Sequence, residues 1–446
     1  MVAHIFRSYD VRGIYKKDLD EKIMEGIGKA LWQTTRDDIA VGMDMRTSSP
    51  KLREAFIKGV TAKKKVYDLG LAPMGAAMFY AWKHKLMLAY ITASHLAKEW
   101  NGVKFFHADG IGFVEEENFR VRDIFLRGKN IKGKEGRISL ADNNKAINDY
   151  KTYLLSKIRM KKKPRIVIDC GNGMASIIAP QLFREAGCEV FTIFDKLDGT
   201  FPNRDPEPTA ETISELKKEV KKRKADIGIA YDGDADRMLI VDDKARVVVP
   251  EQIAYFVLSE LLKKESGPIV ANVECTKAVD DVALQFNRKV FRIRVGHPYL
   301  VKEAKKRKAA FGLESAGHFV LPSLVPFDDA LAVSFYAVSV LSRLKKKLSS
   351  IVDEIPRYFF ERINFNCADE KKFEVIEKLK TELKKEYRNI NEMDGIRIDF
   401  PEGWVLIRAS NTGPTIRLTV EGKTKKGFDE LKKRFNEKLR SGLAVT

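Results

Sequence analysis

The chain has 446 residues, of which 44% are hydrophobic and 32% are charged. This balance is typical of a globular protein with about three or four domains. The sequence has no apolar run of the roughly 18 residues that cross a bilayer, and its charged start does not resemble a secretory signal. Four cysteines without a CxxC pair argue against a zinc site or a disulfide framework, so we expect a cytoplasmic protein without a membrane partner.

The net charge of +19 allows either nucleic-acid binding or a lysine-rich solvated surface. The basic clusters are dispersed and lack interleaved aromatic residues, which a single-strand groove requires. They lie at residues 63–65, 161–163, 217–224 and 305–308. We therefore expect a solvated surface and no specific nucleic-acid partner.

In chain order, the first part of the sequence alternates apolar strands with helical stretches, a βα pattern. The predicted strands are 38–43, 86–91, 165–170 and 225–231. The predicted helices are 50–64, 143–159 and a segment that ends at 186. The turn Gly171-Asn172-Gly173 lacks the third glycine of a dinucleotide site, because Ser176 stands there, so we interpret it as a tight turn.

The βα pattern restarts near residue 250 and changes in the last part of the chain. Helices are predicted at 251–264, up to 286 and at 328–347, with strands at 268–272 and 290–293. The last part mixes strands at 359–367, 403–409 and 415–421 with helices at 370–387 and 426–441. The predicted fold class is α/β, with three similar α/β domains and a C-terminal α+β domain. The predicted domains are residues 1–150, 151–248, 249–357 and 358–446.

Three carboxylates alternate directly after the predicted strand 225–231. Asp232, Asp234 and Asp236 repel one another unless a cation neutralises them, and hard oxygen ligands suit Mg²⁺. The alternatives are a solvated acidic turn and a calcium loop of the EF-hand type. The calcium loop fails because its sixth position requires glycine and Arg237 stands there. A metal loop at the carboxyl end of a strand is the favoured interpretation.

A second polar group follows the predicted strand 86–91. Ser94 has an imidazole beside it in His95 and an amine ten residues further on in Lys104. A serine hydroxyl needs a base or a phosphoryl group to become reactive, and no Gly-x-Ser-x-Gly motif indicates a hydrolase. From spacing alone, a Ser/Thr cluster bonded to its own backbone is the favoured interpretation.

Two further loops carry hydrogen-bonding groups. The segment from Gly312 to His318 contains Glu314 and Ser315, which suit sugar hydroxyls. The segment from Arg408 to Arg417 flanks a Ser/Asn/Thr/Gly loop with two arginines, whose guanidinium forks match phosphate oxygens. The alternative for the second loop is an ordinary hairpin.

Taken together and in order, these motifs resemble the α-D-phosphohexomutases, in particular the phosphomannomutase/phosphoglucomutase branch. The matching segments are Tyr9 to Gly13, Gly42 to Ser49, Thr92 to His95, Phe201 to Asn203, Asp232 to Arg237, Val295 to His297, Glu314 to His318 and Arg408 to Thr412. The resemblance runs along nearly the whole chain. It implies four domains around a central cleft.

The resemblance also implies a reaction. A phosphorylated serine donates its phosphoryl group to a hexose 1- or 6-phosphate, and the resulting 1,6-bisphosphate returns its other phosphoryl group. The implied catalytic residues are Ser94, His95, Lys104, Arg237 and Arg12, with a lowered pKa expected for the lysine. The implied Mg²⁺ ligands are Asp232, Asp234, Asp236 and Ser94. The implied substrate-binding residues are Tyr9, His297, Glu314, Ser315, His318, Arg408, Ser410, Asn411, Thr412 and Arg417.

Some positions depart from the family pattern. The pair Leu96-Ala97 stands where Asn-Pro is usual, and Arg204 stands where His is common. In the other two loops Leu313 replaces Gly, Ala316 replaces Ser and Gly413 replaces Glu. We expect an active monomeric or homodimeric enzyme acting on mannose and/or glucose phosphates. The alternatives are a phosphoglucosamine mutase, an impaired sugar-phosphate binder and a nucleic-acid-binding protein.

Overall fold

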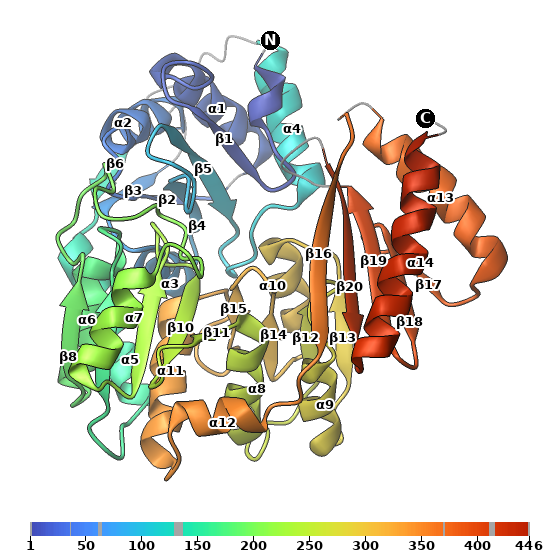
Figure 1. The fold of residues 1–446 in the computed structure, drawn as a ribbon. Coiled ribbons are helices and arrows are strands. Elements are labelled where there is room, and N and C mark those ends of the chain that lie inside the picture. Colours follow the sequence, from blue (N-terminus) through green and yellow to red (C-terminus); the bar gives the residue numbers. More distant parts are fainter. Residues whose placement is uncertain are drawn as a thin grey trace. The chain divides into compact units, whose positions relative to one another are not determined.

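The computed structural model describes residues 2–35, 37–60, 65–128, 137–368, 371–409 and 415–444 (Figure 1). The chain divides into two compact units. Unit 1 comprises Met1–Gly267 and Gly296–Glu354, and unit 2 comprises Pro268–Val295 and Ile355–Thr446. Within the described ranges, the helices are all too short or too polar to cross a membrane.

The first sheet of unit 1 has the strand order β1-β5-β4-β2-β3-β6. Its strands are β1 (Asp10–Ile14), β2 (Ile39–Met43), β3 (Val66–Leu71), β4 (Met87–Ile91), β5 (Trp100–Phe106) and β6 (Ile138–Leu140). Pairs among β2, β3, β4 and β6 are parallel, whereas β5 is antiparallel to both β4 and β1. The strand β5, which carries Lys104, is not among the strands predicted from the sequence.

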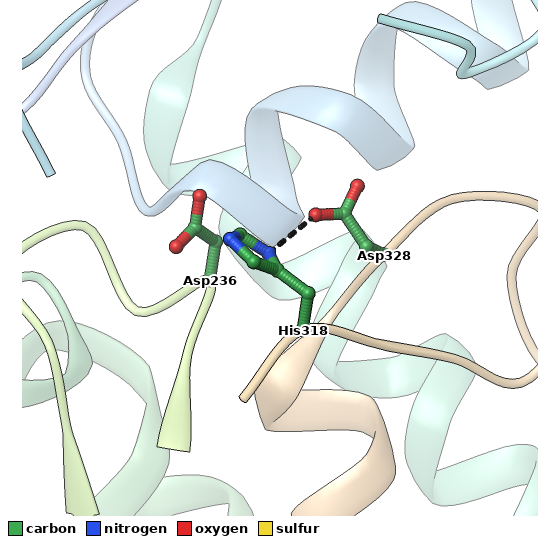
Figure 2. A group of neighbouring side chains, drawn as sticks. All are labelled: Asp236, His318 and Asp328. Atoms are coloured by element: carbon green, nitrogen blue, oxygen red, sulfur yellow. Dashed lines mark hydrogen bonds and ion pairs between the residues drawn. The ribbon is translucent and has the colours of Figure 1, made fainter. Parts of the chain in front are cut away.

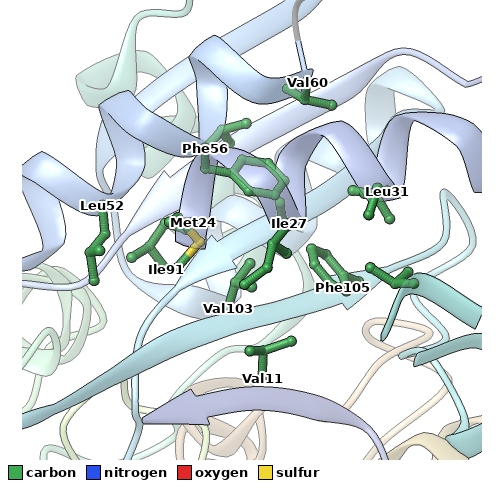
Figure 3. Close-up of a cluster of buried hydrophobic side chains, with 14 of the residues drawn as sticks. Val11, Met24, Ile27, Leu31, Leu52, Phe56, Val60, Ile91, Val103 and Phe105 are labelled. Carbon is green, nitrogen blue, oxygen red and sulfur yellow. The ribbon is translucent and has the colours of Figure 1, made fainter. Parts of the chain in front are cut away.

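Apolar side chains at helical spacing hold this sheet to its helices. The helices are α1 (Glu21–Thr34), α2 (Ser49–Val60), α3 (Met74–His84) and α4 (Glu115–Leu126). Figure 3 shows Ile27 and Phe56, from α1 and α2, packed with Phe105 of β5 in one buried cluster. Burying such side chains stabilises the fold by about 1.5–3 kcal/mol each. This core fixes the strand ends from which the Ser94 loop leaves.

The second sheet of unit 1 has the strand order β11-β10-β9-β7-β8. The strands are β7 (Arg165–Asp169), β8 (Glu189–Ile193), β9 (Ile227–Tyr231), β10 (Met238–Asp242) and β11 (Val247–Val248), with helices α5 (Asn143–Lys157), α6 (Ala175–Glu185) and α7 (Ser214–Arg223). The central strand β9, parallel to β7 and antiparallel to β10, is entirely buried, as expected for a strand covered on both faces. The metal loop, residues 232–236, joins β9 to the antiparallel β10.

The remainder of unit 1 contains the hairpin of β14 (Phe311–Leu313) and β15 (Phe319–Val320). Its helices are α8 (Pro250–Leu261), α10 (His297–Lys306), α11 (Ala330–Arg343) and α12 (Leu348–Glu354). The single helix predicted over 328–347 is wrong at its C-terminal end. Leu344 has an extended backbone that stops α11, and α12 then begins at Leu348.

Unit 2 joins a parallel pair of strands to an antiparallel sheet. The pair is β12 (Ile269–Asn272) and β13 (Val290–Ile293), accompanied by α9 (Ala278–Gln285). The sheet has the order β16-β20-β19-β18-β17, formed by β16 (Phe359–Asn366), β17 (Ile390–Asn391), β18 (Ile396–Phe400), β19 (Gly403–Ala409) and β20 (Thr415–Gly422). Its core includes apolar residues of α13 (Lys372–Glu386) and α14 (Lys425–Ala444). The predicted fold class is confirmed, while the domain boundaries at 150, 248 and 357 stay predictions.

Candidate active site

The Ser94 hydroxyl lies against the metal loop. Its Oγ donates a 2.9 Å hydrogen bond to Asp232 Oδ2, and its backbone N–H donates to Thr92 Oγ1 at 2.8 Å. Ser94 is buried and has a positive φ of 52°, a conformation that non-glycine residues rarely adopt. A side chain at Gly233 would meet the Ser94 carbonyl at 2.5 Å, so glycine allows this close approach. Two loops that are 138 residues apart in sequence thus meet at one hydroxyl.

The metal loop concentrates negative charge in a buried place. One oxygen from each of Asp232, Asp234 and Asp236 lies within 4.8 Å of the others. Burial, with the neighbouring carboxylates adding to it, raises the pKa of Asp232 well above its ordinary value. Burial would raise the pKa of Asp236 as well. Lys104, His318 and Arg237 outweigh this effect of burial and hold the pKa of Asp236 well below its ordinary value.

This donor set fits a divalent cation. Oδ1 of Asp234 and Oδ1 of Asp236 are buried, and neither has a hydrogen-bond partner among the described residues. Unsatisfied buried carboxylate oxygens are costly, and hard cations such as Mg²⁺ are bound through such oxygens. The arrangement therefore supports the predicted metal loop.

Lys104 supplies a cation to the same loop from strand β5. Its Nζ donates to Asp236 Oδ2 at 2.6 Å and to Asp234 Oδ2 at 3.1 Å. Burial alone would lower the pKa of Lys104, but the two carboxylates raise it above its ordinary value. The lowered pKa expected from the sequence is therefore not found, because the sequence analysis did not place the lysine between two acids.

The remaining predicted catalytic side chains surround this centre. His95 Nδ1 lies 3.3 Å from Ser94 Oγ. Burial, followed by the charges of Arg237 and Arg12, holds the pKa of His95 far below its ordinary value, so the imidazole is neutral. Arg12 lies on β1, which pairs with β5, and its Nε donates to Asp10 at 2.7 Å.

The predicted sugar-contact residues of unit 1 form a linked group. The rings of Tyr9 and His297 meet edge to face at 5.5 Å. His297 stacks on His318 at 5.2 Å, and His318 Nε2 accepts a 2.9 Å hydrogen bond from Arg237 Nε. Glu314 Oε1 accepts from the backbone N–H of Gly296 at 2.7 Å, which fixes the turn before α10. Ser315 is partly exposed in the same loop.

Arg46 is a further buried residue beside Ser94, and no motif in the sequence gives it a role. This fully buried guanidinium donates to four carbonyls of the Ser94 loop, residues 93–100, and to one carboxylate. The acceptors are Ser94 O, Leu96 O, Ala97 O, Trp100 O and Asp44 Oδ2, at 2.6 to 3.1 Å. All five N–H donors of an arginine are thereby used. The pair of opposite charges at 44 and 46, directly after a strand, is the signal that could have indicated it.

Comparisons with known proteins agree with this geometry. Models of the four phosphoglucomutase/phosphomannomutase domains match residues 3–132, 147–245, 249–359 and 363–438. A probable phosphoglucosamine mutase of Methanocella arvoryzae is 34% identical over 94% of this chain and 93% of its own length. A phosphomannomutase/phosphoglucomutase of Pseudomonas syringae is 31% identical over 98% and 95%. The chain belongs to the phosphohexomutase family.

The fold is also that of solved phosphohexomutases. A crystal structure of a phosphoglucomutase/phosphomannomutase family protein from Burkholderia thailandensis has a TM-score of 0.90. It is 24% identical and covers 99% of this chain and 98% of its own. A putative phosphomannomutase from Thermus thermophilus has a TM-score of 0.81 at 19% identity, covering 97% and 98% of the two chains.

In this phosphohexomutase the predicted phosphate loop lies in unit 2. Arg408 on β19 pairs directly with Arg417 on β20, and Arg408 Nη1 donates to Glu274 at 2.9 Å. Arg362 of β16 donates to the same carboxylate at 3.3 Å. Ser410, Asn411 and Thr412 lie outside the described residues, as does Gly413.

The structure gives two of the departures a physical account. Arg46 bonds only to the backbone of Leu96 and Ala97, so their side chains do not enter that contact. Arg204 is buried and donates to Asp169 at 2.9 Å and to the Tyr231 carbonyl at 2.6 Å, directly before the metal loop. Both arginines donate hydrogen bonds to backbone carbonyls of the loops around Ser94 and do not contact its hydroxyl.

Proposed function

We propose that this phosphohexomutase interconverts hexose 1-phosphates and hexose 6-phosphates through phosphorylated Ser94. The observation that carries the proposal is the hydrogen bond from Ser94 Oγ to Asp232 within a buried triple-carboxylate loop. Phosphoryl transfer requires positioning and charge neutralisation above all, and both are provided around this hydroxyl.

The proposed reaction has two balanced transfers. A free hydroxyl of the hexose monophosphate attacks the phosphorus on Ser94, the P–O bond to Ser94 Oγ breaks, and the hydroxyl proton passes to a nearby base. The hexose 1,6-bisphosphate then reorients in the site, and Ser94 Oγ attacks its other phosphorus. The P–O bond to the sugar oxygen breaks, the Ser94 proton passes to a nearby base, and the freed sugar oxygen takes up a proton. The bisphosphate is therefore both intermediate and activator.

This chain's residues have distinct proposed roles in these transfers. Neutral His95, with its Nδ1 3.3 Å from Ser94 Oγ, supports the position of this hydroxyl through a hydrogen bond. Arg12 and Arg237 stabilise the charge of the phosphoryl oxygens. A divalent cation held by the three aspartates and Ser94 would neutralise the carboxylates, which leaves Lys104 available as a proton donor or acceptor.

For the substrate, we propose mannose and/or glucose phosphates, with Tyr9, His297, Glu314, Ser315 and His318 facing the sugar. The residues proposed for the distal phosphate are Arg408, Arg417 and the loop of Ser410, Asn411 and Thr412. The second candidate is glucosamine phosphate, which is supported by the name of the Methanocella relative. A small-molecule phosphosugar is the proposed partner in either case.

A coupled assay tests the proposal. The 1-phosphates of mannose, glucose and glucosamine are each supplied with Mg²⁺ and a trace of hexose 1,6-bisphosphate. Wild type should convert at least one, and Ser94→Ala should convert none, while the exposed control Ser156→Ala keeps wild-type turnover. Conversion of glucosamine 1-phosphate alone would select the second candidate. Conversion of none would indicate a sugar-phosphate binder and refute the proposal.

A further inference from the structure

Asp328 is a buried carboxylate that serves two histidines. Its Oδ2 accepts a 2.8 Å hydrogen bond from His318 Nδ1 and lies 3.4 Å from His297 Nδ1. The two imidazole rings are stacked, with an angle of 17° between their planes. Figure 2 shows Asp328 and Asp236 on opposite sides of the His318 ring. Asp328 therefore contacts the histidines on the side of the His318 ring that faces away from Asp236.

The hydrogen bonds of His318 determine which ring nitrogen carries the proton. Arg237 Nε lies 2.9 Å from His318 Nε2, and an arginine N–H can only donate. Nε2 must therefore be an unprotonated acceptor. The ring proton then resides on Nδ1, where the Asp328 carboxylate accepts it. A carboxylate on one nitrogen thus fixes the tautomer, which in turn fixes the guanidinium on the other.

The same three residues, Asp236, His318 and Asp328, have the spacing of a possible metal site. The chemistry argues against that interpretation. Both nitrogens of His318 are already used in hydrogen bonds, and Lys104 and Arg237 supply positive charge beside Asp236. We therefore interpret the group as a hydrogen-bonded chain.

The backbone that carries Asp328 is held firmly. Asp328 forms a bridge with Val320 of β15, and the next residue, Asp329, donates its backbone N–H to Phe319 at 2.9 Å. Asp329 also caps α11 through the N–H of Ala332 at 3.0 Å and accepts a hydrogen bond from Tyr150. These contacts hold the backbone of Asp328 in place independently of the histidines.

We propose that Asp328 is a positioning residue that locks His318 in the Nδ1–H tautomer so that Nε2 holds the Arg237 guanidinium beside the metal loop. Without that acceptor, Arg237 Nε would be buried unpaired and the guanidinium would turn away, towards Glu207, which lies 3.9 Å from its Nη1. The consequence for turnover rests on the proposed function, whereas the tautomer does not.

The first test is spectroscopic. The chain has six histidines, so ¹⁵N-labelled histidine gives few signals, and His318→Gln assigns the one of interest. In the wild type, the ¹⁵N signals should show that Nδ1 of His318 is protonated and that Nε2 is unprotonated. An Nε2–H tautomer or an imidazolium in the folded wild type would overturn the proposal without any variant at Asp328.

The second test uses Asp328→Asn, with Asp123→Asn, at an exposed aspartate of α4, as a control of equal size and charge change. The asparagine amide can donate to Nδ1, which moves the proton to Nε2 and removes the acceptor for Arg237. We expect the tautomer to change in Asp328→Asn only. We also expect kcat to fall about 100-fold with KM within a few-fold, as for a misplaced catalytic group.

The outcomes separate the two claims. An Asp328→Asn protein that is destabilised but keeps the Nδ1–H tautomer and normal kcat would overturn the positioning role. Wild-type protein that lacks mutase turnover yet shows the predicted tautomer would refute the proposed function and support the tautomer lock. If Asp328→Asn does not fold, the wild-type spectrum decides.

Discussion

Replacing Arg46 by lysine should loosen the Ser94 loop. Arginine donates five N–H groups there and lysine has three, so at least two hydrogen bonds are lost. Charge-assisted bonds are worth about 1.5 kcal/mol or more each, which gives a loss of about 3 kcal/mol in local stability. Because about 1.4 kcal/mol corresponds to a factor of ten in an equilibrium constant, this loss should accelerate amide exchange in the loop about 100-fold.

Hydrogen exchange followed by mass spectrometry measures this effect directly. Peptides covering residues 93–100 should exchange faster in Arg46→Lys, whereas those from α5 should not change. The control is Arg165→Lys, since this exposed arginine bonds Glu189 and a carbonyl far from the loop. Unchanged exchange at residues 93–100 in Arg46→Lys would refute the positioning role of Arg46.

Three further outcomes are expected. Lys104→Met should lower kcat by about 100-fold or more and lower the thermal midpoint, since two buried carboxylates lose their cation; turnover within threefold of wild type would contradict this. Removing divalent cations with EDTA should lower the midpoint by several degrees, and Mg²⁺ should restore it, because the metal loop stays self-repelling without a cation; no response to Mg²⁺ would argue against a cation site. Burial raises the pKa of Asp329 from 3.8 to about 6, so the native state holds this proton more tightly and stability falls as pH rises between the two values. Asp329→Asn should therefore gain up to about 3 kcal/mol relative to wild type between pH 4 and pH 7 in urea titrations, and a pH-independent difference would contradict the assignment.

The sequence predicts what depends on local pattern. Strands such as β4 and β9 lie where apolar runs predict them, because a buried strand needs continuous apolar side chains. The metal loop, residues 232–236, begins where the apolar run of β9 ends. The family resemblance, given by the ordered motifs, and the fold class, given by the alternation of strands and helices, are confirmed by the four domain models.

The sequence does not predict what depends on distant contacts. Arg46 acts on carbonyls about 50 residues away, and nothing in its neighbours reveals those acceptors. The pKa of Lys104 is raised rather than lowered because Asp234 and Asp236 lie beside its ammonium group, and these partners are 130 and 132 residues away in sequence. The sequence predicts Asp328 only as the first residue of a helix, although its side chain faces His318.

The most direct test of the account is transfer of a labelled phosphoryl group to Ser94. The protein is incubated with Mg²⁺ and ³²P-labelled hexose 1,6-bisphosphate, and the label is located by peptide mapping. We predict label on Ser94 alone, its loss to sugar when unlabelled hexose 6-phosphate is added, and none in Ser94→Ala. Label on another residue, or mutase turnover that survives Ser94→Ala, would contradict the central claim.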